Sequence, residues 1–293
     1  MKTKQKKPVT GKFYTFLVNQ GLSLTTVNKM NNIARAYLDW KTSNTHSYDE
    51  VINYVKYCQS LGNVARTINQ KIKALDYYFQ YINHPENPAK QIKIKGSVRK
   101  IPTKLLNQEE LDELYSLLPT NGLINKRNKI LMSLVIYQGV GSTELSKIEV
   151  TDLDLAKGKI YVPSTKTTNS RTLDLTVEQA LGLQDYLLKI RPILHQEYQV
   201  QDTGKLLITL GKGNQVNGLS NVIIVILRKV RLVYPRLQNL QQIRQSVITN
   251  WIKNEGLRQA QYKAGHKYVS STERYQEDKF EGLKKELNQF HPL

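Results

Sequence analysis

The chain has 293 residues, and its 43 Lys and Arg against 24 Asp and Glu give a formal net charge of +19. This excess favours a polyanionic partner such as nucleic acid, with a merely basic soluble protein or attraction to an anionic membrane as the alternatives. The single cysteine, Cys58, excludes a disulfide framework and a cysteine-based zinc site. No apolar run approaches the roughly 18 residues of a membrane span, and no secretory leader is visible, so the cytoplasm is the expected location.

The first hundred residues are predicted to be helical. Apolar residues at spacings of three and four give one apolar face to each of three segments, Ser23 to Trp40, Tyr48 to Leu61 and Val64 to Ile82. With a shorter helix near Phe13 to Asn19, they form a small four-helix unit. This stretch holds 17 Lys and Arg against 5 Asp and Glu, which is typical of a DNA-binding module.

A basic, proline-containing stretch follows, from His84 to Leu106, in which the apolar period is lost. We interpret residues 89–105 as a linker that lies along a phosphate backbone, with an ordinary surface loop as the alternative. The expected boundaries are therefore a helical domain at 1–88, the linker, a second domain at 106–276 and a C-terminal tail at 277–293.

The second domain is predicted to be mixed. The expected helices are Gln108–Leu118, Arg127–Gly139, Val177–Ile190, Asn221–Tyr234, Leu240–Asn254 and Leu257–Ala264. Two short strands, Lys159–Pro163 and Arg171–Leu175, alternate in polarity and form a hairpin with Lys166 near its tip. The expected fold class is mainly α with a small β-sheet. No nucleotide-binding or metal-binding motif is present, and the five histidines have no ligand spacing, so no metal or cofactor is expected.

Four local patterns, taken in order, resemble the tyrosine recombinases of the phage integrase family. GVGSTELSKIEVTDLDL is similar to the family's first box, Lys166 to its hairpin lysine, and Arg244 to the arginine of its His-x-x-Arg box. AGHKYVSSTERY is similar to the Gly-His segment that precedes the family's nucleophilic tyrosine. The resemblance covers nearly the whole chain. It implies a SAM-like helical DNA-binding domain followed by a mixed α/β catalytic domain.

The resemblance also implies a role for each matched residue. Tyr275 would attack a DNA phosphodiester, make a 3′-phosphotyrosyl link and free a 5′-hydroxyl. Arg244 and His266 would bind the phosphate, and Lys166 would protonate the departing oxygen. The alternative for each of these residues is a role in packing or a position on the surface.

Further basic residues are candidates for DNA contact. They are Arg66, Lys71, Lys93, Lys95, Arg99, Lys100 and Arg171, the last with a structural role as its alternative. The expected partner is double-stranded DNA with inverted half-sites, bound by a dimer on one site and by a tetramer at synapsis. The tail, with Phe280, Leu283 and Leu287 on one face of an amphipathic helix, is expected to pack on a neighbouring protomer or to fold back in cis.

Two positions depart from the family pattern. Gly141 stands where the first box has arginine, and Gln241 stands where the second box has histidine. Either another basic residue reaches the phosphate, with Lys147, Arg127 and Arg171 as candidates, or the protein has lost cleavage. The favoured hypothesis is a site-specific recombinase that integrates, excises or resolves a DNA element. The alternatives are a DNA-binding accessory or regulatory protein without catalysis and a type IB topoisomerase-like relaxing enzyme.

Overall fold

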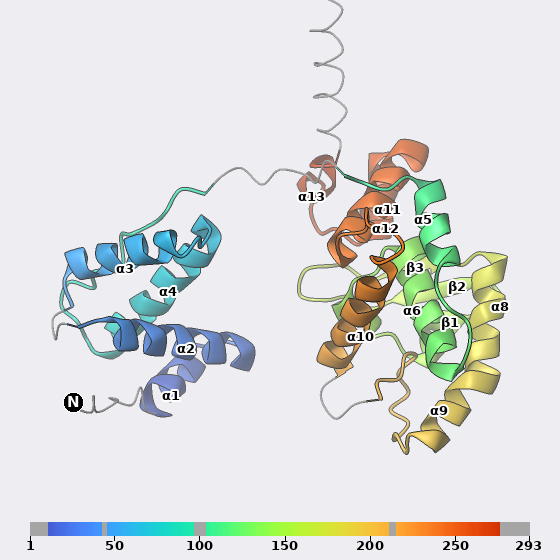
Figure 1. The fold of residues 1–293 in the computed structure, drawn as a ribbon, viewed down its shortest axis with the longest axis horizontal. Coiled ribbons are helices and arrows are strands. Elements are labelled where there is room, and N and C mark those ends of the chain that lie inside the picture. The colour runs from blue at the N-terminus through green and yellow to red at the C-terminus, as the bar shows by residue number, and fades with distance from the viewer. Residues whose placement is uncertain (1–10, 43–45, 97–103, 211–214, 276–293) are drawn as a thin grey trace, which may run out of the picture. The chain divides into compact units, whose positions relative to one another are not determined.

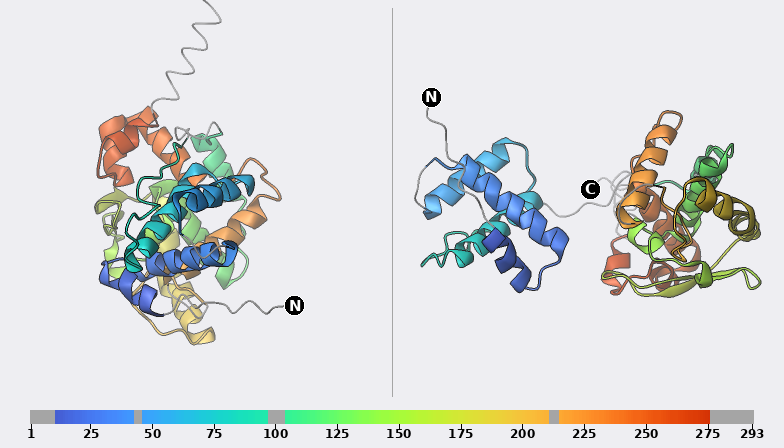
Figure 2. Two further views of the ribbon diagram at one scale, coloured as in Figure 1. Left: turned by 90° about the vertical axis from the view of Figure 1, so that its left-hand side faces the viewer. Right: turned by 90° about the horizontal axis from the view of Figure 1, so that it is seen from below.

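The computed structural model describes residues 11–42, 46–96, 104–210 and 215–275. The chain divides into two compact units, residues 1–99 and 100–293 (Figures 1 and 2). Within the described ranges, no helix is long and apolar enough to cross a membrane.

Four helices form the first unit: α1 (Gly11–Asn19), α2 (Leu24–Trp40), α3 (Tyr48–Ser60) and α4 (Ala65–Tyr81). Their inward faces carry the apolar residues at helical spacing, and Tyr37 of α2 lies at the centre with no exposed surface. Its ring packs edge-on against Tyr54 of α3 and Phe79 of α4. The four expected helices are confirmed, with ends that differ from the prediction by no more than two residues.

The chain beyond α4 folds back onto the same unit. Ala89 is buried, and Ile92 and Ile94 pack against the core. The Asn69 side chain donates a hydrogen bond to the Ile94 carbonyl and accepts one from the Ile94 N–H, both at 2.8 Å. Residues 89–96 of the expected linker therefore pack against the helices of the first unit. Residues 97–103 lie outside the described residues.

The second unit is mostly helical around a small sheet, as expected. Its elements are α5 (Gln108–Ser116), α6 (Leu123–Gln138), α7 (Ser142–Leu145), η1 (Val150–Asp152), β1 (Leu153–Asp154), β2 (Lys159–Val162), β3 (Arg171–Asp174), α8 (Val177–Asp185), η2 (Tyr186–Ile190), α9 (Arg191–Glu197), α10 (Gln215–Val230), α11 (Leu240–Glu255), α12 (Leu257–Ala264) and α13 (Ser270–Glu273). Helix α6 is buried on most sides and forms the centre of the core. Helices α11, α12 and α13 lie together, and α12 contacts β3 (Figure 1).

The three strands form an antiparallel sheet in the order β1-β2-β3. In β2, Ile160 and Val162 are buried, and their partners in β3 are Leu173 and Arg171. Side chains alternate between the two faces of a strand, so Arg171 shares the buried face with Leu173. The strand register thus carries a charged residue into the interior.

Candidate active site

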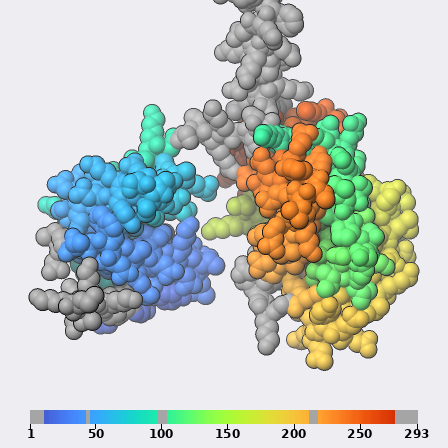
Figure 3. Space-filling view, in the orientation of Figure 1, coloured from blue at the N-terminus to red at the C-terminus, as the bar shows by residue number. Residues whose placement is uncertain are grey.

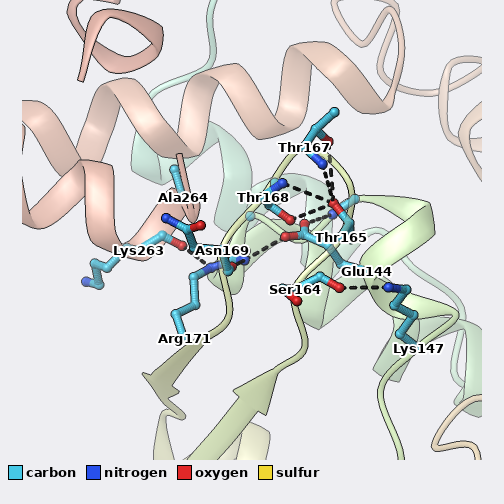
Figure 4. A network of polar contacts seen from close by, with 12 residues as sticks. Glu144, Lys147, Ser164, Thr165, Thr167, Thr168, Asn169, Arg171, Lys263 and Ala264 are labelled. Atoms are coloured by element: carbon cyan, nitrogen blue, oxygen red, sulfur yellow. Dashed lines mark hydrogen bonds and ion pairs between the residues drawn. The ribbon is translucent and has the colours of Figure 1, made fainter. Parts of the chain in front are cut away.

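A buried carboxylate forms the centre of the site. Glu144 is the third residue of α7, and its Oε2 accepts a hydrogen bond from the Gly141 N–H at 2.9 Å, which closes the first turn. The same carboxylate binds two guanidinium groups. Oε1 accepts from Arg171 Nη1 at 2.6 Å, and Oε2 accepts from Arg244 Nη1 at 2.7 Å. Figure 4 shows Arg171 extending from β3 toward Glu144.

The charge of Glu144 is set by these partners. Burial alone would raise its pKa, but the charge of Arg244, followed by the hydrogen bond and charge of Arg171, lowers the pKa to about 2. Glu144 is therefore ionised at neutral pH, and one negative charge is shared by two arginines.

Arg244, on α11, is held by two backbone carbonyls in addition to Glu144. Nη1 donates to the Gly139 carbonyl, and Nη2 donates to the Ala264 carbonyl at 2.8 Å. Gly139 ends α6 with a φ of +57°, and a Cβ there would lie 3.1 Å from the Trp251 ring. The Arg244 side chain keeps 19% of its surface exposed, so its guanidinium is oriented by the protein and still accessible.

Arg171, a predicted DNA-contact residue with a structural role as its alternative, is buried in this fold. Its side chain has no exposed surface. Nε donates to the Lys263 carbonyl at 2.6 Å, and Nη1 binds Glu144. The alternation of β3 turns it inward, and the buried carboxylate compensates its charge. DNA therefore cannot reach it in this conformation.

His266 and Tyr275 lie next to each other after α12. Gly265 ends α12 with a φ of +68°, and the chain turns there toward His266. His266 Nδ1 lies 2.8 Å from Thr272 Oγ1, and its ring stacks on Tyr275 with centroids 6.2 Å apart and planes 11° apart. Burial, and then the charges of Arg244 and Arg171, lower the pKa of His266 to about 4, so its ring is neutral at pH 7.

The β2–β3 hairpin presents Lys166 at an exposed position beside this segment. Thr165 Oγ1 accepts from the Thr167 and Thr168 N–H groups at 3.2 and 3.1 Å, which orders the tip (Figure 4). Thr168 forms an isolated antiparallel bridge with His266. Lys267 Nζ donates to the Lys166 carbonyl at 3.1 Å, so the hairpin is fastened to the histidine segment.

The two substituted positions lie at the same cluster. Gly141 has an extended backbone, and a Cβ added there would lie 3.7 Å from Glu144 Oε2 and 3.9 Å from Arg244 Nη1, so the position has room for a side chain. Gln241 is exposed one turn before Arg244 on α11. The structure thus brings together Arg244, His266, Tyr275 and the hairpin of Lys166, with Gly141 and Gln241 beside Arg244.

The remaining basic candidates, Lys100 excepted, belong to the first unit. Arg66, Lys93 and Lys95 are exposed. Lys71 is half-buried, with Nζ 3.3 Å from Cys58 Sγ and 5.7 Å from the centre of the Tyr54 ring. Arg99 and Lys100, like the tail at 277–293, lie outside the described residues.

Glu144 is the site residue that the sequence reasoning missed. It was part of the Ser-Thr-Glu-Leu pattern and received no role. A signal was available, because an acidic residue three positions after a helix start can bind back to the start of that helix. The burial that makes it the partner of two arginines was not visible in the pattern. Within the described ranges, no group of three His, Cys, Asp or Glu side chains could hold a metal ion.

Comparisons with known proteins identify the family of the chain. The model of the phage integrase family matches residues 104–281. Tyrosine recombinase XerD of Listeria monocytogenes serotype 4b (strain F2365) is 25% identical over 288 residues, which cover 94% of this chain and 95% of that protein. TnP I resolvase of Bacillus thuringiensis is 23% identical over 281 residues, covering 90% of this chain and 93% of that protein.

Solved structures share the fold. XerH site-specific recombinase, bound to its palindromic difH substrate after cleavage, matches with a TM-score of 0.66 at 16% identity, over 93% of this chain and 82% of that chain. The lambda integrase dimer bound to a COC′ core site matches with a TM-score of 0.61 at 14% identity, over 90% of this chain and 75% of that chain. Since the family model spans more than half of the sequence, this chain belongs to the phage integrase family of site-specific tyrosine recombinases.

Proposed function

We propose that this recombinase cuts and rejoins DNA with Tyr275 as the nucleophile, Arg244 and His266 as phosphate-binding groups and Lys166 as the general acid. The arrangement around Arg244 carries the proposal. Its guanidinium is oriented by Glu144 and two carbonyls, remains accessible, and lies in the cluster that contains His266 beside Tyr275. A rigidly held guanidinium is suited to the charge that develops on a phosphoryl group.

The chemistry follows from these positions. The Tyr275 phenol oxygen bonds to phosphorus as the bond from phosphorus to the 5′ oxygen breaks, and the phenolic proton passes to water. The 5′ oxygen takes a proton from the Lys166 ammonium and leaves as a hydroxyl. The energy of the phosphodiester is retained in the 3′-phosphotyrosyl link, so rejoining needs no ATP. Neutral His266 donates a hydrogen bond to a non-bridging oxygen through its second ring nitrogen.

The first unit is proposed to grip the DNA backbone. Its excess of Lys and Arg supports this role, as do the exposed Arg66, Lys93 and Lys95. The partner is double-stranded DNA with inverted half-sites, which places one protomer on each half-site and four protomers at synapsis. The XerH recombinase bound to a palindromic substrate and the lambda integrase dimer bound to a core site support this arrangement.

Covalent trapping tests the function. The purified full-length protein would be incubated with labelled nicked duplexes from the DNA that flanks its gene and then run on a denaturing gel. We expect a DNA–protein band that Tyr275→Phe abolishes and that Tyr268→Phe, at an exposed tyrosine seven residues earlier, leaves in place. A band that persists in Tyr275→Phe would overturn the assignment of the nucleophile.

The second candidate is a DNA-binding accessory protein without cleavage, and Gly141 and Gln241 are the observations that favour it. Losing one preorganised donor costs a factor of about 10²–10³ in rate. Sequence-specific binding in a native gel with no covalent band from the wild-type protein would establish this candidate. Relaxation of any supercoiled DNA, regardless of sequence, would instead indicate a topoisomerase-like activity.

A further inference from the structure

The missing arginine at position 141 raises the question of which cation takes its place. Of the three candidates drawn from the sequence, two are buried and the third binds a backbone carbonyl of the hairpin. Arg171 has no exposed side-chain surface, and Arg127, with 3% of its surface exposed, donates to the Ile208 carbonyl at 2.8 Å. Lys147 Nζ donates to the Ser164 carbonyl at 2.7 Å, which fastens the base of the hairpin (Figure 4).

An open groove of about 360 Å³ lies beside the active site, between α10 and the start of α11. Its lining includes Ser142, which follows Gly141, and Gln241, which lies one turn before Arg244. The groove is therefore lined by one of the two positions at which this chain departs from the family pattern, Gln241, and by the residue next to the other, Ser142. Ile223 and Leu227 of α10 form part of its apolar wall. Figure 3 shows that the segment containing α10, in orange, forms an exposed ridge of the second unit.

Arg231 is the cationic side chain of this groove. It follows the end of α10, and its Nε donates to the Leu227 carbonyl at 3.3 Å, which keeps the side chain at the wall. Among the described residues it forms no ion pair with a carboxylate, whereas Arg171 and Arg244 share the single charge of Glu144. The full charge of Arg231 is thus available to an anion in the groove.

We propose that Arg231 contacts a non-bridging oxygen of the scissile phosphate and supplies the positive charge that Gly141 lacks. This inference rests on the proposed recombinase function. The family pattern has this charge in the first box, whereas in this chain it comes from the residue after α10, across the groove that Ser142 and Gln241 line. A planar guanidinium fits a phosphate through two parallel hydrogen bonds.

The test compares two substrates in the covalent trapping assay at saturating protein. One carries a normal scissile phosphate, and the other carries a methylphosphonate, which lacks one of the charged oxygens. On the phosphate, Arg231→Ala should slow adduct formation by a factor of about 10²–10³. On the methylphosphonate, the same variant should react at nearly the wild-type rate, because the charge that Arg231 neutralises is gone.

Two further variants complete the test. Arg228→Ala removes an exposed arginine on α10 that is not part of the groove lining, and it should affect both substrates equally. Gly141→Arg in the Arg231→Ala background should restore adduct formation on the phosphate, since a Cβ at position 141 meets no atom closer than 3.7 Å.

Three results would overturn the inference. They are an Arg231→Ala variant with the wild-type rate on phosphate, equal losses on both substrates, and no recovery with Gly141→Arg. A wild-type protein that forms no adduct at all would overturn the proposed function as well, and this distinguishes the two failures.

Discussion

Gly265 lies in direct contact with the Arg171 guanidinium, and only a glycine fits at position 265. A Cβ at position 265 would lie 2.6 Å from Arg171 Nη1 and 2.9 Å from the Asn169 carbonyl oxygen, and the φ of +68° also disfavours a side chain. The guanidinium that binds Glu144 thereby packs against the turn that delivers His266 to the site.

Gly265→Ala is expected to destabilise the second unit by about 2–4 kcal/mol, from left-handed strain plus overpacking of a buried contact. Gly204→Ala is the matched control, because its φ is +72° and nothing lies within 4 Å of the added Cβ. The control should lose only about 1–2 kcal/mol. Urea unfolding measures both, with Trp251 fluorescence in a Trp40→Phe background reporting on the second unit. Equal losses of unfolding free energy in the two variants would show that the Arg171 side chain moves aside at little cost.

Glu144→Ala should lower the free energy of unfolding by about 3–5 kcal/mol, because it leaves the buried Arg171 without an anion. It should also slow adduct formation, since Arg244 loses its orienting partner. Glu197→Ala, at an exposed position of α9, should stay within about 0.5 kcal/mol of wild type. The same fluorescence-detected unfolding provides the measurement. A near-neutral Glu144→Ala would mean that backbone carbonyls alone hold the two arginines.

Stability should fall in acid in two stages. The pKa of His266 is lowered from 6.5 to about 4, so the unfolded state binds more protons between these values and stability declines as the pH falls through that window. The pKa of Glu144 is lowered from 4.5 to about 2, so its contribution is complete above 4.5 and is lost as the pH falls toward 2. His266→Gln should flatten the first stage and leave the second. Urea midpoints measured across both windows for the two proteins provide the check, and an unchanged first stage would assign it to another group.

The DNA grip of the first unit should depend on Asn69, which carries no charge. Asn69→Ala removes both hydrogen bonds to Ile94, at a cost of about 1–3 kcal/mol, and loosens the segment that carries Lys93 and Lys95. DNA affinity should drop, with a salt dependence close to that of wild type. Lys93→Ala should instead reduce the slope of affinity against salt by about 1. Gln91→Ala, exposed in the same segment, serves as the control.

Removing residues 277–293 should weaken synapsis and spare binding to a single site, because we propose that this tail packs on a neighbouring protomer. Native gels resolve the single-site complex, and recombination between two sites reports synapsis. Unchanged recombination by the truncated protein would favour a tail that folds back in cis.

Elements with a one-sided apolar face were predictable from the sequence. Helices α2 and α4 each begin within one residue of the predicted start. Their apolar residues recur at spacings of three and four, and this pattern marks the extent of the buried helix face. Helix α6 begins at Leu123, four residues before the prediction, because a helix buried on most sides has no polar face to mark its ends. Strand β1 has two residues, too few for a period to be visible.

Helix α9 was missed for a different reason. The predicted helix ends at Ile190, two residues before Pro192. In the structure, α8 passes through the π-helical turn η2 into α9, and the proline stands in the first turn of α9, where a missing N–H is tolerated.

The site was predictable where a motif fixes residue types and not where tertiary packing sets them. Arg244, His266 and Tyr275 lie in one cluster, as the resemblance implied. Glu144, the partner of the arginines, could not be predicted in this way. Its contact with Arg171 depends on the register of β3, and its contact with Arg244 joins segments 100 residues apart in the sequence. The spacing of residues within one segment does not predict such contacts between distant segments.

The bridge between Thr168 and His266, with the bond from Asn169 N–H to the Gly265 carbonyl at 2.8 Å, joins the β2–β3 hairpin to the turn that carries His266. A movement of the hairpin away from its position must also break these contacts with Gly265 and His266. With the roles proposed above for Lys166 and His266, a displaced hairpin therefore removes the general acid and a phosphate-binding group at the same time.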